Sequence, residues 1–294
     1  MTREEKTFDV LYNAGLCWSV SREETYTKDG GVTGAYCTRR SDTGAVLGNV
    51  GSRYLPMQNQ TLVEEFIDAT EQIGLTEITG KCIDGGRKIL LKARIGDVTI
   101  GNDIVKRYIT VSNSHDGSSQ VLLGMHNVVQ VCTNGLTREI NHNQLGIVKH
   151  TTNSGDKMNW YIRNLPKVIQ AEEEMIKTYK KLSEIQVNKE HVKRVIEKIY
   201  EVDMSQMEEE VSTRKKNMIR KFDETLHTNG LNVHGNTLWG LLQTITFLTS
   251  HDKEGKVQEE KGMIGKGQEM GNMTYELLVD FINNPVHETE EVYA

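Results

Sequence analysis

The sequence predicts an α+β protein, with a mainly antiparallel sheet in the N-terminal half followed by a helical C-terminal half. Up to about residue 160, β-branched runs alternate with Gly, Asn and Asp turn residues. Beyond that point, apolar residues recur at steps of three and four, which is the spacing of an amphipathic helix. We therefore divide the chain into three parts: a β-rich domain with one early helix (1–160), an amphipathic helical arm or hairpin (161–228), and C-terminal helices with an acidic tail (229–294).

Turn signals in the first part predict hairpins. They lie at Gly30-Gly31, Asp84–Gly86, Gly96-Asp97 and Asp116-Gly117, and strands are expected over 88–95 and 104–111. The early helix is expected over 61–73, where Leu62, Phe66 and Ile67 share one face and Thr61 with Glu64 has the pattern of a capping box.

Helices in the second half are expected over 165–185, 192–199, 237–250 and 270–282, with Asn188 and Ser205 as N-caps. The apolar stripe that includes Ile176 and Leu182 must be buried, either within the chain or against a second subunit. We expect self-association if this arm projects. The basic cluster Arg214–Lys216 with Arg220 and Lys221 is either a solvated helix face or a contact for phosphate or another subunit.

Composition limits the function classes. The 294 residues include 35 Lys and Arg against 41 Asp and Glu, a net charge of −6, so no whole-molecule attraction to phosphate or anionic lipid is expected. There is no apolar run long enough to cross a membrane, and no signal-peptide pattern follows residues 1–6, so we expect a cytoplasmic protein. Cys17, Cys37, Cys82 and Cys132 form no CxxC pair, and we expect neither a metal nor a cofactor.

Alternation in the strand over 88–95 separates an apolar face from a basic one, which carries Lys88, Lys92 and Arg94. The next strand has Lys106 beside Tyr108 on one face. Neighbouring strands would combine these into a positive surface with rings for base stacking, as single-strand binders use. The alternative is an ordinary solvated sheet face. Four further residues could extend the surface: Arg39, Arg40, Arg53 and Tyr54.

His115 and Asp116, in Asn113-Ser-His-Asp-Gly-Ser118, have two interpretations. They could supply a metal ligand or a general base, because His titrates near neutrality and a carboxylate can orient it. They could equally form a turn, because Asn, Ser, Asp and Gly close tight connections. HExxH, GxSxG and P-loop patterns are absent from the sequence, so no catalytic residue is predicted.

Several motifs carry a resemblance to a known family. They are Asp42-Thr-Gly44, Leu47-Gly48, Val50, Tyr54, Pro56 and Gln58-Asn59, then Asn113–Gly117, Cys132 with Asn134 and Leu136, and Lys149-His150-Thr151. Together they resemble the phage/plasmid-like protein family built on domain of unknown function 932. Trp239–Thr246 with His251 is similar to a diverged form of its C-terminal motif, and Val129 stands where the family has arginine.

The resemblance implies a context rather than an activity. Members are similar to products of phages and conjugative elements, and their order of sheet and helices is loosely similar to that of single-strand annealing proteins. No catalytic residue is carried over. The motif residues without an assigned role are Asp42, Gln58, Asn59, His115, Asp116, Asn134 and His150. From the residues themselves, Asp42 is expected to hold a turn, and the Gln58 and Asn59 amides to bind loop backbone rather than a ligand.

The main hypothesis is a mobile-element protein that binds single-stranded nucleic acid without catalysis, as an annealing or recombination mediator working as a homo-oligomer. The alternative is a phage-encoded inhibitor of a host defence protein or nuclease, which the acidic balance favours because such a surface suits a basic channel. A metal-dependent hydrolase using His115 and Asp116 is a third hypothesis.

Overall fold

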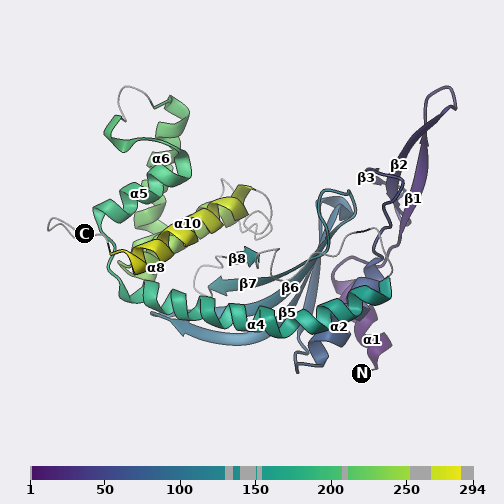
Figure 1. Ribbon diagram of the computed structural model, residues 1–294, viewed down its shortest axis with the longest axis horizontal. Helices are drawn as coiled ribbons and strands as arrows, with labels where there is room; N and C mark the ends of the chain where they lie inside the picture. The colour runs from purple at the N-terminus through teal and green to yellow at the C-terminus, as the bar shows by residue number, and fades with distance from the viewer. Residues whose placement is uncertain are drawn as a thin grey trace. The chain divides into compact units, whose positions relative to one another are not determined.

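A computed structural model of the chain describes residues 2–129, 135–139, 150, 154–206, 211–251 and 266–285 (Figure 1). The chain divides into two compact units. The first comprises residues 1–95, 108–125 and 139–171, and the second comprises residues 96–107, 126–138 and 172–294. Asn134, Cys132 and the acidic tail Glu288–Glu291 lie outside the described residues.

The first unit begins with helix α1 (Arg3–Asn13) and a three-stranded antiparallel sheet of β1 (Val20–Tyr26), β2 (Val32–Arg40) and β3 (Val46–Val50). Val20 pairs with Arg40, and Tyr26 with Val32. The turn between them is the one predicted at Gly30-Gly31. Residues 26–35 are all exposed, so this hairpin extends from the body of its unit (Figure 1).

The larger sheet has the strand order β4-β5-β6-β7-β8. Its strands are β4 (Ile78–Ile83), β5 (Lys88–Ile100), β6 (Asp103–Ser114), β7 (Leu122–Val129) and β8 (Gly135–Glu139). The short helix η1 (Asp84–Gly86) joins β4 to its antiparallel partner β5. Antiparallel sheets thus occupy the N-terminal half, as predicted.

Helix α2 (Asn59–Glu71) supplies much of the first unit's core. Leu62, Val63 and Ile67 are fully buried, as are Ile89 and Leu91 of β5. Each side chain of this kind contributes about 1.5–3 kcal/mol when it leaves water. The alternation predicted for β5 is therefore confirmed on its apolar face, although Leu90 on the basic face is also buried.

The C-terminal half is helical, which confirms the predicted fold class. Its elements are α4 (Ser154–Glu184), α5 (Lys189–Tyr200), η2 (Met204–Gln206), α6 (Thr213–Thr225), η3 (Leu226–Leu231), α7 (Asn232–His234), α8 (Leu238–Ser250) and α10 (Lys266–Asn283). Asn188 caps α5 as predicted, since its Oδ1 accepts from the His191 amide at 2.8 Å. The Tyr179 ring on α4 lies 5.2 Å from Trp239 on α8 and 5.8 Å from Tyr275 on α10.

Three local predictions were wrong. Gly96-Asp97 lies inside β5, where Gly96 has φ 143°, and the strands instead turn at Gly101-Asn102. Glycine adopts that φ without steric cost, so the chain remains extended. Ser205 lies in η2, and Ser212 caps α6 instead.

The capping box at Thr61 was also wrong, because α2 begins two residues earlier. Gln58 is its N-cap and makes no side-chain cap bond, since its amide is bonded to the backbone of β1. Glu64 accepts from Gln60 rather than capping the helix. Within the described residues, none of the helices is long and apolar enough to span a bilayer.

A buried carboxylate organises the second unit. Asp103 at the start of β6 is 2% exposed, and its Oδ2 lies 2.7 Å from Nδ1 of His234 and 2.6 Å from Nε1 of Trp239. One carboxylate oxygen thus accepts from two rings on α7 and α8. Such charge-assisted bonds hold a strand end to the helices of the same unit.

Replacing Asp103 with Ala should destabilise the second unit by about 3–5 kcal/mol, because it leaves two buried ring N–H donors without an acceptor. Urea unfolding followed by tryptophan fluorescence measures this loss. Asp29→Ala in the exposed β1–β2 turn is the control and should change stability by no more than about 0.5 kcal/mol. Equal stability of the two variants would contradict the role given to Asp103.

Candidate functional site

The motif residues of the first unit converge on the side chain of Asn59. Its Nδ2 donates to the carbonyl oxygens of Leu16 and Trp18, at 3.2 and 3.0 Å. Its Oδ1 therefore faces His115 as an acceptor, 2.8 Å from Nε2. This arrangement fixes the proton of the His115 ring on Nε2 and leaves Nδ1 as an acceptor. No described residue donates to that Nδ1.

Asn59 and His115 are both fully buried, so the bond is shielded from water. His115 follows β6, where its backbone N–H donates to Arg87 O and its carbonyl accepts from the Thr38 hydroxyl at 2.6 Å. The turn predicted after it is confirmed: Asp116 Oδ1 accepts from the Ser118 amide at 2.9 Å. Among the described residues, no group of three or more metal-binding side chains forms around them.

The Trp18 side chain lies between the buried Asn59–His115 pair and Arg40, the last residue of β2. Its ring meets His115 edge to face, with centroids 5.4 Å apart, and the Arg40 guanidinium stacks 4.2 Å from its centroid. Arg40 also forms a bidentate pair with Asp42, at 2.7 and 3.0 Å, which lowers the pKa of that carboxyl. Asp42 therefore holds Arg40 at the turn before β3.

Tyr54 and His150 form a second contact layer. The Tyr54 hydroxyl donates to Ser114 O at 2.8 Å, and its ring lies 4.7 Å from that of His150. Burial raises the pKa of Tyr54 well above its usual value.

Gly48 on β3 packs so closely on the turn at Asp116 that an added Cβ would lie 2.5 Å from the Asp116 Cα.

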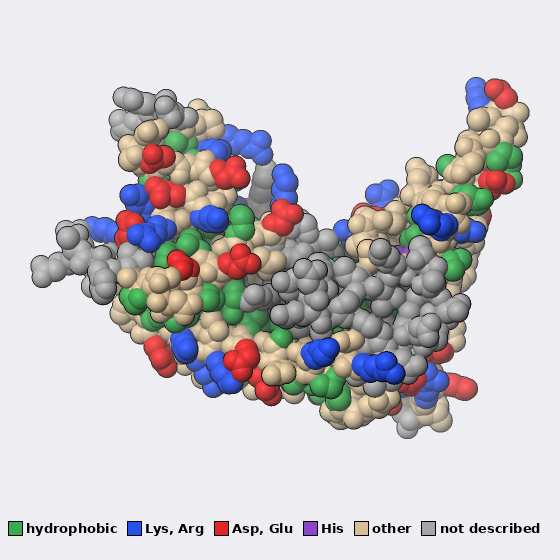
Figure 2. Space-filling model, viewed as in Figure 1, with side chains coloured by type: hydrophobic (Ala, Val, Ile, Leu, Met, Phe, Trp, Pro, Cys, Tyr) green, Lys and Arg blue, Asp and Glu red, His purple; other side chains and the backbone are tan. Residues whose placement is uncertain are grey.

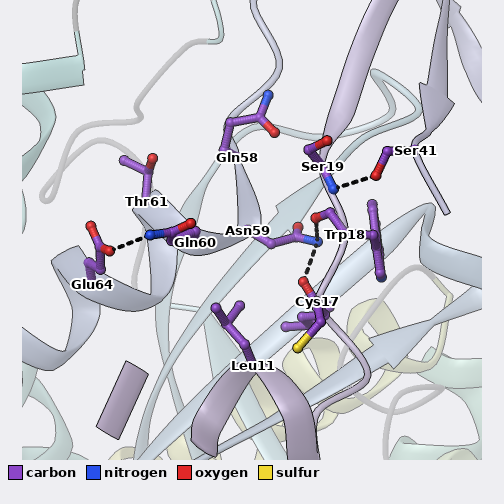
Figure 3. Close-up of a pocket in the computed structure, with 11 residues that line it drawn as sticks. Leu11, Cys17, Trp18, Ser19, Ser41, Gln58, Asn59, Gln60, Thr61 and Glu64 are labelled. Atoms are coloured by element: carbon purple, nitrogen blue, oxygen red, sulfur yellow. Dashed lines mark hydrogen bonds between the residues drawn. The ribbon is translucent and has the colours of Figure 1, made fainter. Parts of the chain in front are cut away.

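A pocket of about 650 Å³ opens beside this centre (Figure 3). That volume lies in the range of small-molecule sites. It is lined by Leu11, Leu16, Cys17, Trp18, Ser19, Ser41, Gln58, Asn59, Gln60, Thr61 and Glu64. The Gln58 amide bonds the N–H and carbonyl of Val20, and the Asn59 amide is bonded as described above. Both amides thus bind backbone, as predicted: Gln58 that of Val20 at the start of β1, and Asn59 that of the loop before it.

Burial sets the charge of His115. Loss of hydration is the main cause that lowers its pKa to about 4, with a smaller contribution from the neighbouring His150, while Asp116 opposes the shift. The ring is therefore neutral at physiological pH. A neutral, buried imidazole bonded to an amide holds the fold together and has no contact with solvent.

The structure separates the predicted nucleic-acid residues into two groups. Arg40 and Tyr54 are bonded internally, Arg39 pairs with Glu23 at 2.7 Å, and Arg94 pairs with Glu77 at 3.0 Å. The Lys92 ammonium lies 5.4 Å from the Tyr108 ring centroid. The side chains of the other three form no hydrogen bond or ion pair with any described residue: Arg53, Lys88 and Lys106. Lys106 belongs to the second unit.

Comparison of the sequence with family descriptions gives a match to a domain of unknown function (DUF932) over residues 46–269. The chain belongs to the DUF932 family. Comparison with the curated proteins found no match, and comparison with the solved structures found none either. The DUF932 match covers Gln58, Asn59 and His115, whereas Trp18, Arg40 and Asp42 precede it.

Sequence reasoning missed two residues, one beside the buried Asn59–His115 pair and one in the second unit's core. Trp18 has no motif spacing of its own, although a large aromatic side chain between Leu16 and Val20 indicates burial. Asp103 stands at the start of a strand, where exposed turn residues are also common. The apolar residues that follow it directly are the one weak signal that it is buried.

Gly48→Ala should lower the free energy of unfolding by about 1–3 kcal/mol, because the new methyl group would overlap the backbone of Asp116, which cannot move as a flexible side chain can. Gly51→Ala is the matched control, since its Cβ would meet no atom within 4 Å. Thermal and urea unfolding of the two variants measure the difference. Equal melting temperatures would show that β3 and the turn at Asp116 do not pack as described.

The His115 ring should make stability depend on pH. The unfolded chain binds a proton near pH 6.5 and the folded one near pH 4, so stability falls as pH drops through this window and then levels off. The loss is about 3 kcal/mol. Urea unfolding of the wild type and of His115→Gln at pH 7 and pH 4 isolates this contribution. A pH dependence identical in both proteins would contradict it.

Proposed function

We propose that the protein binds single-stranded nucleic acid, without catalysis, through the basic and aromatic side chains of β5 and β6 in the first unit. The observation that supports this best is the contact between Lys92 and Tyr108. Both side chains are half-buried. A nucleotide presents a phosphate and a base together, so a cation beside an aromatic ring matches both of its parts.

The basic row on β5 supports the same proposal. Lys88, Lys92 and Arg94 share one face of the strand and span about 20 Å at the rise of an extended chain. Such a row follows an extended strand of nucleic acid and reads no sequence. Glu77 pairs with one member of the row, Arg94, at 3.0 Å. Arg53, exposed after β3, is a further available cation of this unit.

The test is a fluorescence-anisotropy titration of a labelled 20-residue oligothymidylate at several salt concentrations. Wild-type protein should bind at micromolar concentration, and binding should weaken as salt rises. Lys88→Ala with Lys92→Ala should reduce the salt slope by about 1.4, because each phosphate that the protein no longer neutralises lowers the slope by about 0.7. Lys167→Ala, an exposed lysine on α4 of the same unit, should leave it unchanged. Absence of salt-sensitive binding at micromolar protein would refute the proposal.

The contribution of the Tyr108 ring to binding is tested separately. Tyr108→Leu should weaken binding by about 1–3 kcal/mol, and Tyr108→Phe should retain it, because stacking uses the ring and not the hydroxyl. Circular dichroism checks that each variant remains folded.

The resemblance to products of phages and conjugative elements supports placing this binding in annealing or recombination for a mobile element. Homo-oligomer formation stays a prediction. Ile176 and Leu182 of the apolar stripe belong to the second unit and are buried in the single chain, so a contact between subunits would use another surface. Light scattering compares the particle mass with the 33.3 kDa of the chain.

The net charge of −6 favours a second candidate, an inhibitor of a host defence protein or nuclease. An acidic protein is repelled by nucleic acid and attracted to the basic channel of a protein that binds it. Pull-down from host lysate treated with nuclease separates the candidates: a host protein retained without nucleic acid favours the inhibitor.

A further inference from the structure

A groove of about 440 Å³ lies between α5 and α6 in the second unit. Its floor is apolar and is formed by Val192, Ile196, Met204 and Ile219. Three of these residues are buried: Val192, Ile196 and Ile219. The groove is therefore a shallow apolar seam between two helices, which is the kind of surface that accepts a peptide side chain.

Cations border this seam. Lys189 and Lys193 from α5 face Lys216 and Arg220 from α6, and among the described lining residues one, Asp223, is acidic. The described lining therefore carries three more positive than negative side chains, in a chain whose net charge is −6. Figure 2 shows Lys and Arg side chains, with Asp and Glu among them, over this part of the unit. An occupant that fits has carboxylates beside aliphatic or aromatic anchors.

The chain contains a segment with this composition. Residues 286–294, which lie outside the described residues, read Val-His-Glu-Thr-Glu-Glu-Val-Tyr-Ala and combine three carboxylates with Val292 and Tyr293. Helix α10 ends at Asn283, and its Phe281 ring packs 4.8 Å from His191 of α5. The segment therefore leaves α10 next to the helix that forms one wall of the groove. Nine residues reach about 30 Å when extended.

We propose that the α5–α6 groove is a docking site for the chain's own acidic segment 286–294. Glu288, Glu290 and Glu291 meet the cations of the rim, and Val292 or Tyr293 covers the apolar floor. A linker this short gives the segment an effective concentration in the millimolar range, so a weak contact suffices for occupancy. The docking site lies in the second unit and is independent of the nucleic-acid proposal.

The test uses the full chain with its own segment altered by Glu288→Lys, Glu290→Lys and Glu291→Lys, so that the rim repels it. A fluorescein-labelled peptide of residues 286–294 is then titrated by anisotropy. The peptide should bind, and Lys193→Glu with Arg220→Glu should lower its affinity at least tenfold. Lys198→Glu with Lys221→Glu makes the same charge change on exposed positions of the same helices outside the groove, and should alter affinity less than twofold.

Two further comparisons make the result decisive. The chain with its natural segment should bind the peptide at least tenfold more weakly, because the tethered copy competes. A peptide with Val292→Ser and Tyr293→Ser should also bind at least tenfold more weakly. No binding, equal binding by both chains, or equal effects of the two charge-reversed pairs would overturn the proposal. If the Ser-substituted peptide binds as tightly as the natural peptide, charge alone accounts for the contact, and this result would overturn the proposal as well.

Discussion

The first unit depends on one buried hydrogen-bonding group, the Asn59 amide. It satisfies two carbonyl oxygens of the loop between α1 and β1 and, through His115, the segment that follows β6. Each of these groups is removed from water, and an unsatisfied one costs about 1–3 kcal/mol. Without this amide, the Leu16 and Trp18 carbonyl oxygens lose a buried donor in the loop that carries Trp18. The Trp18 ring in turn is the surface on which the Arg40 guanidinium stacks.

The residues that carry the family resemblance therefore perform structural tasks where the structure describes them. Asp42 holds Arg40, Gln58 bonds the backbone of Val20, Asn59 and His115 form the buried centre, and Asp116 closes a turn. This use of polar residues explains how a family pattern rich in Asp, Asn and His can specify a fold. The nucleic-acid surface that we propose uses residues outside that pattern, such as Lys88, Lys92 and Tyr108.

Sequence patterns predicted the features that neighbouring residues determine, such as strand alternation and a helix cap. They missed the contacts between residues that are far apart in the sequence. Alternation in β5 and the Asn188 cap are encoded within a few residues, so the sequence was sufficient for them. The Gly101 turn was missed because Gly96-Asp97 carries the same turn chemistry, and only the pairing of β5 and β6 decides between them. Asn59 and His115 are separated by 56 residues, and Asp103 lies 131 residues from His234. No periodic pattern in the sequence predicts a contact between residues so far apart.

Internal pairing also limits the kind of nucleic acid that the proposed surface favours. Arg39, Arg40 and Arg94 are bonded to carboxylates, so three of the seven cations predicted for the surface are neutralised. A duplex offers chiefly its charged backbone to such a surface, and the overall charge of −6 opposes that approach. A single strand also offers unpaired bases, and stacking on Tyr108 gains energy that salt and net charge do not cancel. Under this proposal, the net negative charge that weakens binding to any nucleic acid favours single strands over duplexes.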